Sequence, residues 1–339
     1  MEPARWPALS VALIAGLAIP AAAADYNYNV RKAPAAGVVD RCAKIEPLPA
    51  TPAMPAGYFF GFTDPTDPGG PCSSELVFDN IVHAGKRDGR YIASTSAAEI
   101  SYTVTRNIAF AFAAYGTTTR WSDVTVTRTA LAGIGDGVAV NRLDMLRFDG
   151  LSAELFARLL ARSPGQPVAM TVSVKPRWSA VDNITGYPAQ GYGGDFKLLM
   201  DVVLTERLFA AANFIYGLGA LKFDISNAPW FHVSAANASA ALTAQVHVAE
   251  KQVIQSVFIG AEGRYRSVFA GLALDRLVGN AFFLGPTLAV GFPNERIISL
   301  AWTPQLAGRS RLGLSSGPMD LDAFERHEFR LKFATPVAP

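Results

Sequence analysis

Acidic and basic side chains recur at alternate positions within several apolar segments of this chain. In residues 257–265, Glu262 and Arg264 fall on the face opposite the apolar side chains, and in residues 168–177 Lys175 does the same. Successive side chains of a β-strand point to opposite faces, so each segment would present its charges on one side. Mixed charges gathered inside a β-barrel either set the selectivity of a pore or pair with one another across it.

The same alternation, followed along the chain, predicts which charged side chains line the lumen of such a barrel. They would not face lipid, because an Arg or Lys at the membrane midplane costs about 2–4 kcal/mol. A water-filled pore and a lumen closed by ion pairs both stay open as interpretations. The predicted lumen-lining residues are Glu99, Glu154, Arg158, Lys175, Arg177, Asp195, Lys197, Asp201, Glu262, Arg264, Arg326, Glu328, Arg330 and Lys332.

Three of these basic residues share one face of the last predicted strand. Arg326, Arg330 and Lys332 would form a basic stripe for anionic solutes, or Glu328, Glu262 and Glu154 would neutralise it. Neutralisation is favoured, because a buried charge without a partner is costly.

The histidines give little support for catalysis. Serine hydrolysis needs a nucleophile beside a base, and the chain has no Gly-x-Ser-x-Gly motif. The four histidines are His83, His232, His247 and His327, of which His327 lies on an apolar strand face beside Phe329. It would occupy either an interfacial aromatic belt or a lipid-facing catalytic position. Because the histidines and cysteines also lack zinc-ligand spacing, we expect no enzyme activity, metal or cofactor.

Cys42 and Cys72 are the only cysteines. Exported thiols tend to oxidise, so we expect a disulfide between them, with two free thiols as the alternative. The bridge would tie an N-terminal leader to the start of the barrel.

The N-terminus has the layout of a secretory signal peptide. Arg5 precedes an apolar run at residues 8–20, and the small residues 22–24 form a cleavage site before Asp25. A membrane helix needs about 17–25 apolar residues, and no later stretch meets this requirement. We therefore expect export with cleavage of the signal peptide.

The composition fits a protein that buries apolar surface outside a soluble core. Half of the residues are hydrophobic and only 17% are charged, whereas soluble domains carry about 25% charged residues. The net charge of +2 gives no sign of a nucleic-acid partner.

From residue 74 onward, about twelve alternating segments are separated by turn-forming residues. An even strand number and alternating short and long connections are typical of outer-membrane barrels. A soluble β-sandwich is the alternative, but its strands average about 5–6 residues. The predicted strands are residues 74–84, 90–104, 108–119, 147–161, 167–179, 193–204, 207–221, 230–246, 253–265, 279–291, 296–307 and 323–333.

The predicted fold is therefore all-β, a transmembrane antiparallel up-and-down β-barrel of about twelve strands with a disordered N-terminal leader. Residues 1–24 form the signal peptide and residues 25–73 an Ala/Pro-rich periplasmic leader. Residues 74–333 form the barrel and residues 334–339 a tail. An aromatic cluster at residues 58–62 would either enter the lumen as a plug or lie on the periplasmic rim.

Several stretches resemble a family of uncharacterised proteobacterial outer-membrane β-barrel proteins. They are Phe60-Gly61-Phe62-Thr63 and residues 85–91, 148–154 and 324–333. The similarity spans about residues 58–333 and consists of structural motifs. It implies a barrel fold and an outer-membrane location, and it implies no substrate.

Together these patterns predict a porin-like protein of the Gram-negative outer membrane, acting as a passive channel or small-solute transporter. The first alternative is a closed barrel with a structural or surface-interaction role, and the last is an outer-membrane hydrolase. The expected partners are outer-membrane lipid and, during insertion, the barrel assembly machinery. We expect a monomer that binds no nucleic acid.

Overall fold

A computed structural model describes residues 58–67, 69–124, 143–162, 166–224, 228–249, 252–311 and 317–337. The predicted signal peptide and most of the predicted leader, including Cys42, lie outside the described residues. No helix in the described part of the chain is long and apolar enough to cross a membrane.

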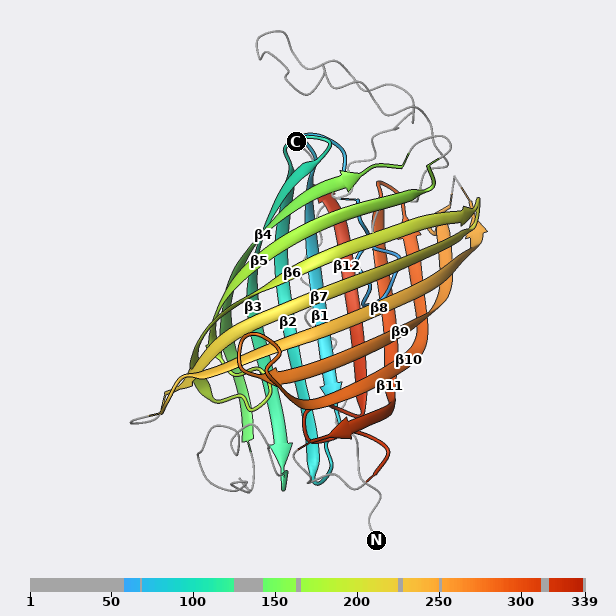
Figure 1. The fold of residues 1–339 in the computed structure, drawn as a ribbon. Helices are drawn as coiled ribbons and strands as arrows, with labels where there is room; N and C mark the ends of the chain where they lie inside the picture. The colour runs from blue at the N-terminus through green and yellow to red at the C-terminus, as the bar shows by residue number, and fades with distance from the viewer. Residues whose placement is uncertain are drawn as a thin grey trace. The chain divides into compact units, whose positions relative to one another are not determined.

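The described residues form a closed antiparallel barrel in which each strand pairs with its neighbours in the chain and β12 pairs back with β1 (Figure 1). The strands are β1 (Ser74–Ala84), β2 (Arg90–Thr103), β3 (Ile108–Ser122), β4 (Leu143–Leu160), β5 (Val168–Val181), β6 (Pro188–Thr205), β7 (Leu208–Phe223), β8 (Phe231–Val248), β9 (Ser256–Ala270), β10 (Arg276–Phe292), β11 (Arg296–Ser310) and β12 (His327–Val337).

The predicted fold class is confirmed, and each predicted strand corresponds to one of these. The largest differences lie at strand ends. β6 begins at Pro188, five residues before the predicted start, because its pairing with β5 continues to Val181↔Pro188. β12 continues to Val337 rather than ending at Phe333, because its pairing with β1 runs to Ser74↔Val337. The predicted tail therefore contributes its first residues to the closing strand.

Many large apolar side chains lie on the outside of the barrel, and in some strands small ones face inward. In β3, Phe110 and Phe112 are exposed, the latter to 61%, and they alternate with buried Ala109, Ala111 and Ala113. An apolar outer surface of this kind suits contact with lipid. The small inward side chains of β3 leave space inside the ring.

β1 begins and β12 ends at the same end of the barrel, which we call the Ser74 end; the opposite end is the Ala84 end. Tight connections such as residues 206–207 and 293–295 lie at the Ser74 end, and the longest described connection, around residues 317–326, lies at the Ala84 end. The expected alternation of connection lengths is incomplete. The connection between β8 and β9 at the Ser74 end (residues 249–255) is longer than the connection between β9 and β10 at the Ala84 end (residues 271–275).

Candidate functional site

Residues 58–67, which we call the plug, cross the lumen of the barrel. Thr66 donates to Asp201 of β6 from its backbone N–H at 2.9 Å and from its hydroxyl at 2.6 Å. Asp64 accepts a hydrogen bond of 3.0 Å from Lys332 of β12. Since β6 and β12 are six strands apart in either direction around the ring, the plug reaches opposite walls. This corrects the assignment of these residues to a periplasmic leader.

Aromatic packing anchors the start of the plug. Phe59 and Phe60 are fully buried. The ring centroid of Phe59 lies 5.3 Å from that of Phe209 and 4.9 Å from that of Phe258. The wall around them consists largely of alanines and small aliphatic side chains. Of the two positions left open for the aromatic cluster, the structure therefore shows the one in the lumen.

A glycine allows the plug backbone to lie directly on the wall. A Cβ atom at Gly61 would lie 2.5 Å from Ala301 Cβ and 2.6 Å from a carboxylate oxygen of Glu262. Glu262 accepts hydrogen bonds of 2.6 Å from the Phe62 N–H and from the Thr63 hydroxyl. Any side chain at this position would break that contact.

Two arginines hold the middle of the plug. The guanidinium of Arg264 lies over the Phe62 ring, with Cζ 3.8 Å from the centroid. Arg330 donates through Nη1 to the carbonyls of Gly61 at 3.2 Å and Phe62 at 3.0 Å. Its Nε and Nη2 bind the carboxylate of Asp79 at 2.9 and 2.7 Å. Arg330 thus connects the plug to β1 as well as to β12.

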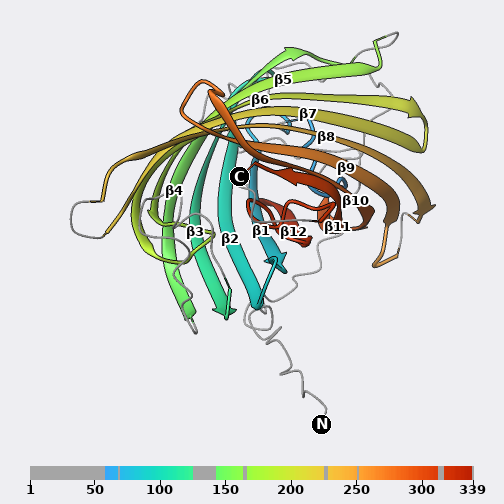
Figure 2. The same cartoon turned by 60° about the horizontal axis from the view of Figure 1, so that its bottom comes forward.

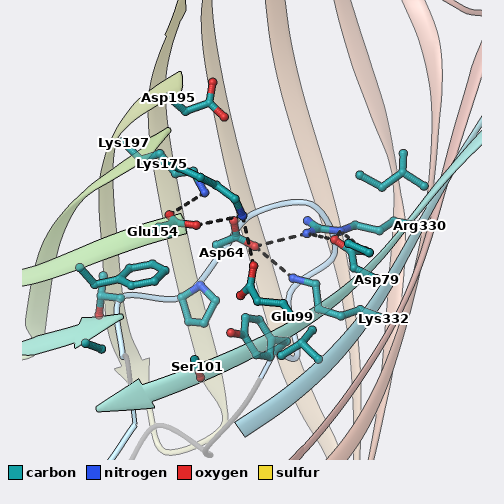
Figure 3. A pocket seen from close by; sticks show the side chains of 18 of the residues that line it. Asp64, Asp79, Glu99, Ser101, Glu154, Lys175, Asp195, Lys197, Arg330 and Lys332 are labelled. Atoms are coloured by element: carbon teal, nitrogen blue, oxygen red, sulfur yellow. Dashed lines mark hydrogen bonds and ion pairs between the residues drawn. The ribbon is translucent and has the colours of Figure 1, made fainter. Parts of the chain in front are cut away.

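Asp64 lies at the centre of the lumen, between Lys332 and Arg330 on one side and a group of lysines on the other (Figure 3). The Lys332 ammonium is 3.0 Å from its carboxylate, and Arg330 Nη2 is 3.6 Å away. Burial alone raises the pKa of Asp64, but the positive charges of Lys332, Arg330 and Lys197 outweigh it and hold that pKa well below its usual range. Asp64 is therefore an anion at neutral pH.

A second group of ion pairs lies beside Asp64. Glu154 accepts Lys175 at 3.0 Å and Lys197 at 2.9 Å, and Lys175 also lies 3.1 Å from Glu99 of β2 (Figure 3). These side chains and the plug enclose a cavity of about 230 Å³. Charged groups of both signs thus surround the space that the plug leaves.

Ion pairs also attach the β11–β12 connection to the Ala84 end, which Figure 2 views obliquely. Lys86 lies 2.8 Å from Glu325, and His83 Nδ1 lies 3.3 Å from Glu325 and 3.5 Å from Glu328. Burial raises the pKa of Glu325, but the positive charges of Lys86 and His83 outweigh it and lower that pKa.

The histidine and the two glutamates offer ligand atoms within 4.8 Å of one another, as a metal site would. However, Glu328 already pairs with Arg264 and Arg266, and Glu325 already pairs with Lys86. A divalent cation would add positive charge among three basic side chains. We interpret the cluster as an ion-pair network that holds the connection on β1.

The same connection contains a buried carboxyl group without a basic partner within ion-pair distance in the described part of the chain. Asp320 is fully buried, and its Oδ1 accepts the N–H groups of Asp322 at 3.2 Å and Ala323 at 3.0 Å. Burial raises the pKa of Asp320 to about 6.

The structure brings most of the predicted lumen residues together but not all of them. Arg158 pairs with Asp67 of the plug, and Asp201 pairs with Arg162. Arg326 is exposed in the connection before β12 and does not line the lumen. The last strand was predicted to begin at residue 323, but β12 begins at His327, so Arg326 precedes it. Within β12 the inward and outward faces are as predicted. The predicted residues that form ion pairs, line the cavity or hydrogen-bond to the plug are Glu99, Glu154, Arg158, Lys175, Arg177, Asp195, Lys197, Asp201, Glu262, Arg264, Glu328, Arg330 and Lys332.

Sequence reasoning missed several charged lumen residues. Asp79 lies in β1, where polar Asn80 faces outward and apolar Ile81 faces inward. The polarity of this strand therefore does not alternate as expected, and the inward face could not be recognised. Asp149 binds Arg177 at 2.5 Å, but the register shift beside Gly150 reverses the alternation there. Asp64 was missed because the plug has no periodicity at all.

The remaining sequence candidates lie away from the lumen. The His327 ring packs against those of Trp302 and Phe329 on the outer face. Cys72 is disulfide-bonded. Since Cys42 lies outside the described residues, its pairing with Cys72 stays a prediction.

Comparison with known proteins supports the fold. The model of a protein family described as a family of unknown function matches residues 53–336. That range contains the stretches that resemble an uncharacterised outer-membrane barrel family, so the predicted resemblance is confirmed. No curated protein matches the chain.

Solved barrels are similar in architecture at low identity. The COG4313 outer membrane channel from Pseudomonas putida F1 is 10% identical, with a TM-score of 0.52 over 80% of this chain and 98% of that one. The beta domain of the Bordetella autotransporter BrkA is 10% identical, with a TM-score of 0.48 over 78% of this chain and 100% of that one. At these identities the likeness concerns the fold alone.

Proposed function

The chain belongs to DUF6662, a family of unknown function, and we propose that it is an outer-membrane channel that the plug holds closed. The apolar outer surface of the barrel would contact lipid, and the Ser74 end would face the periplasm. The carboxylates and basic groups of the lumen would then determine which solutes pass.

One observation carries this proposal: a separate segment of the chain crosses the lumen and fills much of the space between the wall side chains. The wall residues that meet Phe59 and Phe60 include Ala211, Ala241 and Ala289. Barrels of eight strands are filled by their own inward side chains, and larger rings leave room for a channel. Small inward residues in a twelve-stranded ring would leave an opening if the plug moved away.

A closed barrel with a structural role is the second candidate. It is favoured by ion pairs that link walls through the lumen, such as Lys175 of β5 with Glu99 of β2. In that case the plug and these pairs would be permanent parts of the interior. The two candidates differ in what removal of the plug should do.

The deciding experiment is single-channel recording in planar bilayers with the intact protein and with a variant lacking residues 58–67. A channel predicts a closed or rarely conducting intact protein and discrete, frequent conductance steps from the variant. Heat-modifiable migration on gels would verify that both proteins are folded. A folded variant that still fails to conduct would contradict the channel and favour the closed barrel.

A further inference from the structure

Asp64 belongs to the plug, but its carboxylate lies in a basic site formed by residues of the barrel wall. Within the described part of the chain it is the only carboxylate within ion-pair distance of Lys332, whose side chain is almost completely buried. The neighbouring Arg330 has a wall partner of its own, Asp79. Lys332 therefore depends on the plug for its counter-charge, whereas Arg330 does not.

A second contact has the same arrangement. Among the described residues, Asp67 is the only carboxylate within ion-pair distance of Arg158, which belongs to β4. Movement of the plug out of the lumen would therefore leave two wall cations without a carboxylate partner. An open lumen would attract anions at both positions.

The site beside Lys332 is also open to a small solute. Asp64 borders the cavity of about 230 Å³, and its side chain keeps 25% of its exposure there. Lys175 and Lys197 line the same cavity from the other side. A solute in the cavity can thus approach Lys332 at the place where Asp64 now lies.

We propose that Lys332 and Arg330 form a carboxylate-binding subsite of the pore, which Asp64 occupies in the closed state and a carboxylate-bearing solute occupies in the open state. This inference rests on the proposed channel function and names its substrate class. A carboxylate competes directly with Asp64 for the lysine, so such a solute favours release of the plug. A neutral or cationic solute provides no equivalent replacement for Asp64.

Replacement of the missing carboxylate from solution tests the subsite without any need for conductance. Asp64→Ala removes the carboxylate beside Lys332 and leaves empty the space that it occupied. We expect amide hydrogen exchange across residues 58–67 of the detergent-solubilised protein to accelerate about tenfold. Sodium formate at about 50 mM should restore most of the lost protection, and sodium chloride at the same ionic strength should not. If Asp64→Ala does not fold, Asp64→Ser removes the same charge.

The matched control is the double variant Asp64→Ala with Lys332→Gln, in which formate should have no effect on exchange. Formate acting no better than chloride on Asp64→Ala, or acting equally on the double variant, would overturn the subsite. These outcomes are independent of the channel test. A plug-deleted barrel that does not conduct removes the proposed function even if formate restores protection, and a conducting barrel without formate rescue removes only the subsite.

Discussion

Lys332 in the last strand donates a hydrogen bond of 3.0 Å to Asp64 in the plug, although the two residues are 268 positions apart in the chain. Arg330, which holds the plug carbonyls, lies in the same strand. The basic side of the docking site therefore exists only once β12 has paired with β1 and closed the ring. The plug precedes the barrel in the sequence, but its binding site is completed last.

Replacement of Gly61 should release the plug. In Gly61→Ala the new Cβ would lie 2.5 Å from Ala301 Cβ, and overpacking of this kind costs about 1–3 kcal/mol. We expect the open probability in planar bilayers to rise about tenfold, because 1.4 kcal/mol changes an equilibrium constant tenfold. Gly70→Ala is the control, since a Cβ there meets nothing within 4 Å. Equal behaviour of the two variants would contradict the contact.

Loss of the aromatic anchor should loosen the plug without opening the barrel wall. Phe59→Ala removes a fully buried ring that packs against Phe209 and Phe258. Such a truncation lowers stability by about 3–5 kcal/mol. We expect faster hydrogen exchange in residues 58–67 and unchanged exchange in the strands. Phe112→Ala, on the outer face, should leave the plug unaffected. Uniform loss of protection throughout the barrel would show that Phe59 supports the wall instead.

The ion preference of the opened lumen should respond to Lys175. Lys175→Gln leaves Glu99 and Glu154 with less positive charge beside them, so the cavity becomes more negative. In the plug-deleted protein we expect the reversal potential in a KCl gradient to shift toward cation preference. Lys222→Gln changes a lysine that does not line the cavity and should cause no shift. A reversal potential insensitive to Lys175 would remove this residue from the conduction path.

The β11–β12 connection should lose stability as the pH rises. Folding raises the pKa of Asp320 from 3.8 to about 6, so the folded state binds this proton more tightly than the unfolded state. The stabilising contribution is complete below about pH 4 and is lost as the pH rises through 6, by up to about 3 kcal/mol.

Hydrogen exchange in residues 317–326, corrected for the intrinsic pH dependence of exchange, measures this effect. Protection should be greater at pH 5 than at pH 8. Asp320→Asn keeps the Oδ1 acceptor for the Asp322 and Ala323 N–H groups and should make protection independent of pH. A variant with the same pH dependence as the parent would assign the effect to another group.

The sequence by itself determined the barrel. A strand with one face on lipid and one on the lumen must alternate in polarity, and this pattern is local and readable, as in Val257–Tyr265 of β9. The same alternation placed Glu262, Arg264 and Lys332 inside. It failed at Asp149, where a register shift reverses the faces, and at Arg326, which lies just outside its strand.

Only the tertiary structure decided what fills the lumen. Residues 58–67 have no periodicity, and the side chains that bind them come from β4 to β12, far away in the chain. Ring closure sets those distances, and no local pattern encodes them. Whether Lys332 pairs with a wall carboxylate or with Asp64 therefore depends on which groups the closed ring brings within about 4 Å, the range over which charges attract strongly at low dielectric.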